Sequence, residues 1–128
     1  MGDYDFVRER LEDVRSRIER AAARSGRHTR GIVILGVTKF HPLEAVQAAY
    51  DAGIRFFGEN RVQEALGKYP DFLARCPDAR VHMIGHLQGN KVKKAIDLFH
   101  CIQSVDSQDL LAELDKRAAL TGRRIDIL

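Results

Sequence analysis

The feature that most constrains this chain is a repeated alternation of short apolar runs with longer amphipathic segments. The apolar runs are rich in Ile, Val, Leu and Phe and are bounded by Gly or Pro, which is typical of buried strands. We predict strands at 31–39, 54–58, 80–85 and 99–105, and the start of a fifth at 125–128. We predict the intervening helices at 43–52, 61–74, 91–97 and 107–120. This repeat predicts a parallel sheet with helical crossovers.

A further helix is predicted ahead of the first strand, over residues 4–25. Apolar residues recur there at alternating steps of four and three, at Val7, Leu11, Val14, Ile18 and Ala21. Gly26 follows as a natural stop. We expect the apolar stripe to pack on its own domain, with a dimer contact as the alternative. The chain therefore divides into a leading helix at 1–25 and successive βα units at 31–128 of one domain.

Two architectures fit the alternation, a doubly wound sheet and a (β/α)₈ TIM barrel. No GxGxxG sequence follows the first predicted strand, so the glycine turn of a dinucleotide site is missing. Polar residues instead cluster where predicted strands end, at Lys39, 59–60, 88–90 and 104–106. Barrel enzymes assemble their sites at those strand ends. We predict an α/β barrel truncated to about its first five strands, because a complete barrel needs at least about 200 residues.

Composition excludes several classes of partner. The chain has 128 residues, 45% hydrophobic and 30% charged, and a net charge of +3. The arginines before residue 31 alternate with Asp and Glu, which indicates a solvated helix face and no nucleic-acid partner. No apolar run is long enough for a bilayer, and no signal peptide opens the chain. Cys76 and Cys101 form no CxxC pair, so we expect a cytoplasmic protein with free thiols.

His82 and His86 resemble a pair of metal ligands, but the predicted strand separates them. Four residues of extended chain span about 13 Å, which is too far for one ion to bridge. We therefore expect no metal site.

Lys39 ends the first predicted strand and stands just before Phe40, His41 and Pro42. Apolar residues next to an amine disfavour its charged form and so favour the neutral form, which is the form that attacks an aldehyde. By itself, this pattern favours the ordinary alternative, a lysine whose ammonium reaches water.

Asn60 and Glu59 follow the second predicted strand. Asn60 could face a bound cofactor, with Glu59 as a charge that holds Lys39 or Arg61. Alternatively, Asn60 caps the next helix and Gln63 completes a capping box. The two interpretations are compatible.

Gln88 and Asn90 belong to a polar loop that follows the third predicted strand and ends at Lys91. The loop could contact a substrate or a phosphate group, although capping and solvation explain such residues equally well. We retain both interpretations.

Three segments together resemble the pyridoxal phosphate homeostasis proteins (the YggS or PROSC family). They are 37–39 (VTK), 57–64 (FGENRVQE) and 82–91 (HMIGHLQGNK), in the family's order and spacing. The resemblance covers essentially the whole chain. It implies a barrel like the N-terminal domain of alanine racemase, holding pyridoxal 5′-phosphate (PLP), with Lys39 at the Schiff-base position. Asn60, Gln88 and Asn90 are the further candidates for cofactor contacts.

The resemblance implies a PLP-binding, non-catalytic protein that serves intracellular PLP (vitamin B6) and amino-acid homeostasis. One alternative is an amino-acid racemase, which needs a second base, commonly a tyrosine; Tyr4, Tyr50 and Tyr69 all fall in predicted helices. Another is a cofactor-free half-barrel that self-associates through exposed sheet edges.

The sequence departs from the family pattern in two ways. His41 stands where many relatives have a second lysine. The family's phosphate-binding serine and glycine segments would lie beyond Leu128, so we expect the 128-residue chain to bind PLP weakly.

Overall fold

The computed structural model describes residues 2–128 and contains one sheet of five parallel strands. The strands are β1 (Leu35–Val37), β2 (Phe56–Glu59), β3 (Arg80–Met83), β4 (Cys101–Ile102) and β5 (Asp126–Ile127). They lie side by side in chain order, and each neighbouring pair is parallel. A barrel has this order, whereas a doubly wound sheet reverses its direction at a switch point.

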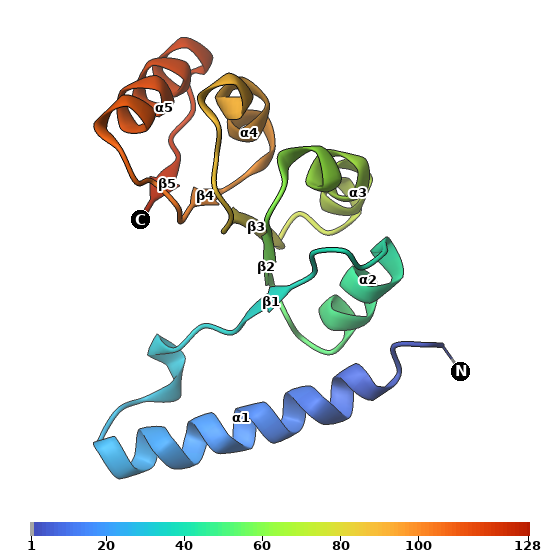
Figure 1. The fold of residues 1–128 in the computed structure, drawn as a ribbon. Coiled ribbons are helices and arrows are strands. Elements are labelled where there is room, and N and C mark those ends of the chain that lie inside the picture. The colour runs from blue at the N-terminus through green and yellow to red at the C-terminus, as the bar shows by residue number, and fades with distance from the viewer. Residues whose placement is uncertain (1) are drawn as a thin grey trace.

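Helices cover one side of the sheet. They are α2 (Leu43–Asp51), α3 (Val62–Arg75), α4 (Val92–Leu98) and α5 (Gln108–Thr121), with short 3₁₀ turns at Thr29–Gly31 and Gly89–Lys91. Figure 1 shows α2, α3, α4 and α5 along the same side of the strand row. This one-sided cover is the outer wall of a barrel, and it confirms the predicted βα alternation.

The leading helix α1 (Phe6–Ser25) packs beside α2 at the β1 end of the sheet. Arg8 and Arg15 donate hydrogen bonds to the carbonyl oxygens of Asp51 and Ala52, at 3.1 and 3.3 Å. Those carbonyls end α2, where the helix dipole favours cations. Because Leu11 is buried in the core as well, the helix packs on its own domain.

Aromatic rings fix α3 against β2. Phe57 of β2 meets Tyr69 and Phe72 of α3 with ring centroids 6.1 and 5.8 Å apart, and all three side chains are fully buried. Tilted and edge-to-face pairs of this kind contribute about 0.5–1.5 kcal/mol each beyond their buried area. The packing sets the position of the preceding residue, Lys68, relative to the strand ends.

Helix ends follow the sequence prediction closely, whereas strands are shorter than predicted. Gly26 and Gly122 end their helices at φ 71° and 67°, and the Ser107 hydroxyl accepts the Leu110 N–H at 3.1 Å. The first strand was predicted over 31–39, but only Leu35–Val37 pairs with β2. The difference has a physical cause: β1 is an edge strand, and its single neighbour has four residues.

The described helices also bear on membrane insertion. Within residues 2–128, none combines the length and the apolar character that crossing a bilayer requires.

Candidate functional site

Lys39 lies in a turn, residues 38–41, that directly follows β1. Its side chain is half-buried, at the carboxyl end of the sheet. The next residue, Phe40, has φ 63° and an exposed ring. A left-handed backbone is uncommon for an aromatic residue and costs about 1–3 kcal/mol, so the surroundings must hold it.

A buried hydrogen-bond network begins at the first residue of this turn. The Thr38 hydroxyl donates to Glu59 Oε1 at 3.0 Å and therefore accepts from the Tyr69 hydroxyl, 2.6 Å away. The Glu59 side chain is fully buried, and its Oε2 has no hydrogen-bond partner within the described residues. Burial raises the pKa of Glu59, although the Lys68 ammonium and the Thr38 hydroxyl act in the opposite direction.

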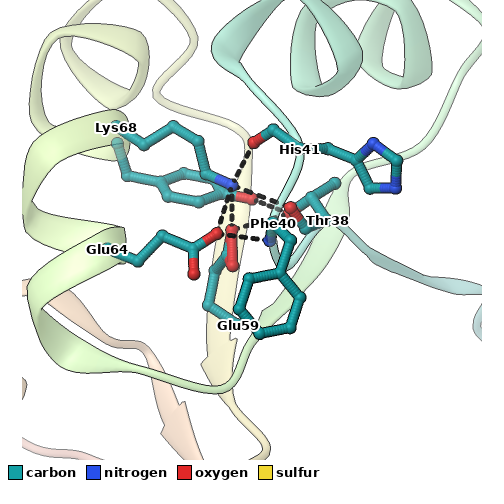
Figure 2. Close-up of polar contacts among 7 residues, drawn as sticks. Thr38, Phe40, His41, Glu59, Glu64 and Lys68 are labelled. Carbon is teal, nitrogen blue, oxygen red and sulfur yellow. Dashed lines mark hydrogen bonds and ion pairs between the residues drawn. The ribbon is translucent and has the colours of Figure 1, made fainter.

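Lys68 joins this network to the turn. Its ammonium pairs with Glu59 and donates hydrogen bonds to the carbonyl oxygens of Thr38 and His41, at 2.8 and 2.7 Å. Glu64, one helical turn earlier, accepts the Phe40 N–H at 2.5 Å and lies 3.5 Å from the same ammonium. Figure 2 shows Lys68 and Glu64 reaching from α3 to the turn. Side chains of one helix thus hold the segment that carries Lys39.

The network corrects three sequence-based interpretations. Glu59 could hold Lys39 or Arg61 according to the sequence, but its charged partner in the structure is Lys68. Asn60 is a candidate helix cap, but the N-cap of α3 is Arg61, whose side chain has no atom that can accept a backbone N–H. Tyr69 lies in a helix, as predicted, and not at a strand end, but its hydroxyl reaches Thr38, directly after β1.

Asn60 and Gln88 line a common hollow between the ends of β2 and β3, with a volume of about 430 Å³. Arg61 and Lys91 line it as well, and no carboxylate occurs among its lining residues as described. Two cations and several amides without an acid favour an anionic ligand.

Lys39 and Asn90 do not line this hollow. Asn90 is exposed in the short 3₁₀ turn before α4. Arg61 links the two regions, because its guanidinium carbon lies 5.7 Å from the centre of the Phe40 ring, next to Lys39.

The histidines considered as metal ligands have separate partners. His82 Nδ1 lies 2.7 Å from the Gln103 amide nitrogen, and His86 Nδ1 lies 3.5 Å from the Asp106 carboxylate. Across residues 2–128, no group of three or more His, Cys, Asp and Glu side chains is arranged to hold a metal ion.

Thr38 and Lys68 were not singled out from the sequence as site residues. One signal existed for Lys68: it follows Glu64 by four residues, which places both on the same face of α3. That spacing alone describes an ordinary surface ion pair.

Comparison with known protein families gives a match over most of the chain. The family model described as "Alanine racemase, N-terminal domain" matches residues 10–128. The chain belongs to this family. The expected fold, a parallel α/β sheet of the alanine racemase N-terminal type, is confirmed.

Similar proteins carry the name suggested by the three sequence segments. The pyridoxal phosphate homeostasis protein of Aquifex aeolicus (strain VF5) is 41% identical over 120 residues, which is 94% of this chain and 52% of that protein. The protein of the same name from Pseudomonas aeruginosa is 38% identical over 111 residues, 87% of this chain and 47% of the relative. The resemblance is therefore confirmed, and the chain spans about half the length of these relatives.

Solved structures show the same relationship. A protein from Bifidobacterium adolescentis superposes with a TM-score of 0.91 and 31% identity, over 100% of this chain and 56% of its own. PipY of Synechococcus elongatus PCC7942, solved with PLP bound, gives a TM-score of 0.72 and 43% identity. That match covers 86% of this chain and 51% of PipY.

Proposed function

We propose that this chain is part of a PLP-binding protein that holds the cofactor through Lys39. We propose further that it acts in the cytoplasm in PLP (vitamin B6) and amino-acid homeostasis, without catalysing a reaction. One observation carries the proposal: Lys39 lies at the carboxyl end of the first parallel strand, in a turn held by α3. The likeness to PipY, which was solved with PLP, supports it.

The donor groups at the strand ends fit PLP chemically. Lys39 offers a half-buried amine for the aldehyde, and Arg61 and Lys91 line a hollow suited to an anion. When bound, PLP supplies an electrophilic aldehyde carbon and an electron-withdrawing ring. We assign Lys39 the covalent role, and Asn60 and Gln88 polar contacts from the hollow. Asn90 stays a weaker candidate, because it lies outside that lining.

In this proposal the residues around Lys39 orient its side chain and do not transfer protons. Lys68 and Glu64 fix the backbone on either side of Lys39. Tyr69 is the tyrosine nearest to Lys39 in this network, but burial raises its pKa and its hydroxyl is bonded to Thr38. A tyrosine in this state is not suited to act as a racemisation base.

Absorbance spectroscopy tests the proposal. We expect PLP added to the chain to give a new visible band that Lys39→Ala abolishes, with no racemisation of alanine. A band that persists in Lys39→Ala contradicts the assignment, and turnover of alanine contradicts the non-catalytic role.

A further inference from the structure

The turn that carries Lys39 is held through its backbone by a side chain from another element. An ammonium group has three protons to donate. Two protons of Lys68 go to the carbonyl oxygens of Thr38 and His41, and the third faces the Glu59 carboxylate. The two carbonyls lie on either side of the Lys39–Phe40 pair. Lys68 therefore fixes both ends of the two-residue segment from which the Lys39 side chain projects.

Glu64 restrains the middle of the same segment. It accepts the Phe40 N–H at 2.5 Å, at the residue with φ 63°. A strained backbone of this kind persists only where several contacts over-determine it. Because the direction of the Lys39 side chain depends on the dihedrals of this turn, Lys68 and Glu64 together select that direction.

The burial of Lys68 distinguishes it from an ordinary surface lysine. Its side chain is only 7% exposed, and burying an ammonium is costly unless it is paired and hydrogen-bonded. Glu59 supplies the opposite charge from β2, and its own side chain is fully buried. A lysine needed only for packing could be replaced by an apolar residue, whereas every donor of Lys68 is used on the turn and its supporting carboxylate.

We propose that Lys68 is a positioning residue, which presents the amine of Lys39 to the aldehyde carbon of PLP by fixing the backbone of residues 38–41. Glu64 assists through Phe40. The inference rests on the proposed function of Lys39, which it deepens. In the reaction concerned, the Lys39 nitrogen bonds to the aldehyde carbon and one water molecule leaves. Borohydride then delivers hydride to that carbon and makes the bond permanent.

The first measurement is the fraction of Lys39 that carries a reduced pyridoxyl group after PLP and borohydride, determined by peptide mapping. We expect Lys68→Met to lower this fraction about tenfold, because small misplacements of reacting groups are costly. Labelling of the exposed Lys93 should not change and serves as an internal reference. Lys68→Arg should restore part of the labelling, since a guanidinium can donate to both carbonyls. The matched control is Lys94→Met, an exposed position on α4.

The second measurement needs no PLP. Amide hydrogen exchange at Phe40 should be about tenfold faster in Lys68→Met and in Glu64→Ala, because each variant removes a side chain that restrains the turn. Unchanged exchange at Phe40 in these variants would overturn the positioning role.

The two measurements separate the possible failures. A wild-type chain without label on Lys39 contradicts the proposed function, whereas a folded Lys68→Met variant labelled within about twofold of wild type contradicts only the positioning role. If Lys68→Met does not fold, Glu64→Ala takes its place, because alanine offers no acceptor for the Phe40 N–H; the expected loss of label and the contradicting result are the same.

Discussion

Gly85 lies directly against the backbone of Asn60. A Cβ atom on Gly85 would be 2.4 Å from the Asn60 carbonyl oxygen and 2.9 Å from its Cα, distances that side chains do not occupy. The contact brings the chain after β3 against the chain after β2. Both residues line the hollow that Gln88 and Arg61 also line. Because Gly85 has no side chain, the chain after β3 can approach the chain after β2 this closely.

Gly85→Ala should destabilise the protein, because the Asn60 backbone must move to accommodate the methyl group. We expect a loss of about 1–3 kcal/mol in the free energy of unfolding, measured by urea denaturation. Gly67→Ala is the matched control. Gly67 lies within α3 with no atom close to the position of a Cβ, so the change should stabilise by about 0.5–1 kcal/mol. Equal stability of Gly85→Ala and wild type would contradict the close approach.

The buried Glu59–Lys68 pair should be sensitive to loss of either partner. Glu59→Gln leaves the Lys68 ammonium without its buried counter-charge, and we expect a loss of about 3 kcal/mol on urea unfolding. The double variant Glu59→Gln/Lys68→Met should lose at least about 1 kcal/mol less than the sum of the single losses.

A partly exposed ion pair on α5 provides the control for this cycle. Glu113 and Arg117 lie 3.0 Å apart on α5, with about a third of each side chain exposed. Glu113→Gln should cost less than about 0.5 kcal/mol. Additive losses at Glu59 and Lys68 would show that the two groups are not coupled.

His100 should make stability depend on pH. Its Nδ1 accepts the Val81 N–H at 2.9 Å, which requires that nitrogen to be unprotonated. Burial, with a contribution from the Arg80 charge, lowers the pKa of His100 below 6.5 in the folded protein. The unfolded chain therefore takes up the proton first. The stability that neutral His100 provides is complete above the unfolded pKa and is lost as pH falls through the folded pKa.

We expect the free energy of unfolding to fall as pH is lowered from about 7.5 to about 5.5, and to fall less in His100→Asn. The Asn side chain offers an oxygen that can accept the Val81 N–H and does not titrate in this range. Denaturation with urea at several pH values checks this. Parallel profiles for the two proteins would exclude His100 as a source of the dependence.

Local chemistry explains which parts could be predicted from sequence. Gly26, Ser107 and Gly122 determine where their own helices begin or end, and each apolar run corresponds to a strand. The parallel sheet and its helices could therefore be predicted from the sequence. The position of Lys39 at the end of a strand could be predicted as well, because the apolar run before it marks the strand. Asn60 and Gln88 follow adjacent strands in the sequence, and in the structure they line one hollow.

The side chains that hold the Lys39 turn in place could not be predicted in this way. Lys68 contacts Thr38 across 30 positions of sequence, and its burial depends on Glu59 from another strand. A lysine on an amphipathic helix usually reaches water, so the local pattern points away from the observed role. Asn90 is exposed within the 3₁₀ turn Gly89–Lys91 and does not line the hollow, although Gln88 and Lys91 on either side of it do.

The most direct test of the central claim is to treat the chain with PLP and borohydride and to map the modified peptide. We expect a pyridoxyl group on Lys39, and its loss in Lys39→Ala. The folded state of that variant should be verified by circular dichroism. A pyridoxyl group found on Lys91 or Lys93 instead, unaffected by Lys39→Ala, would contradict the assignment of Lys39 as the residue that holds the cofactor.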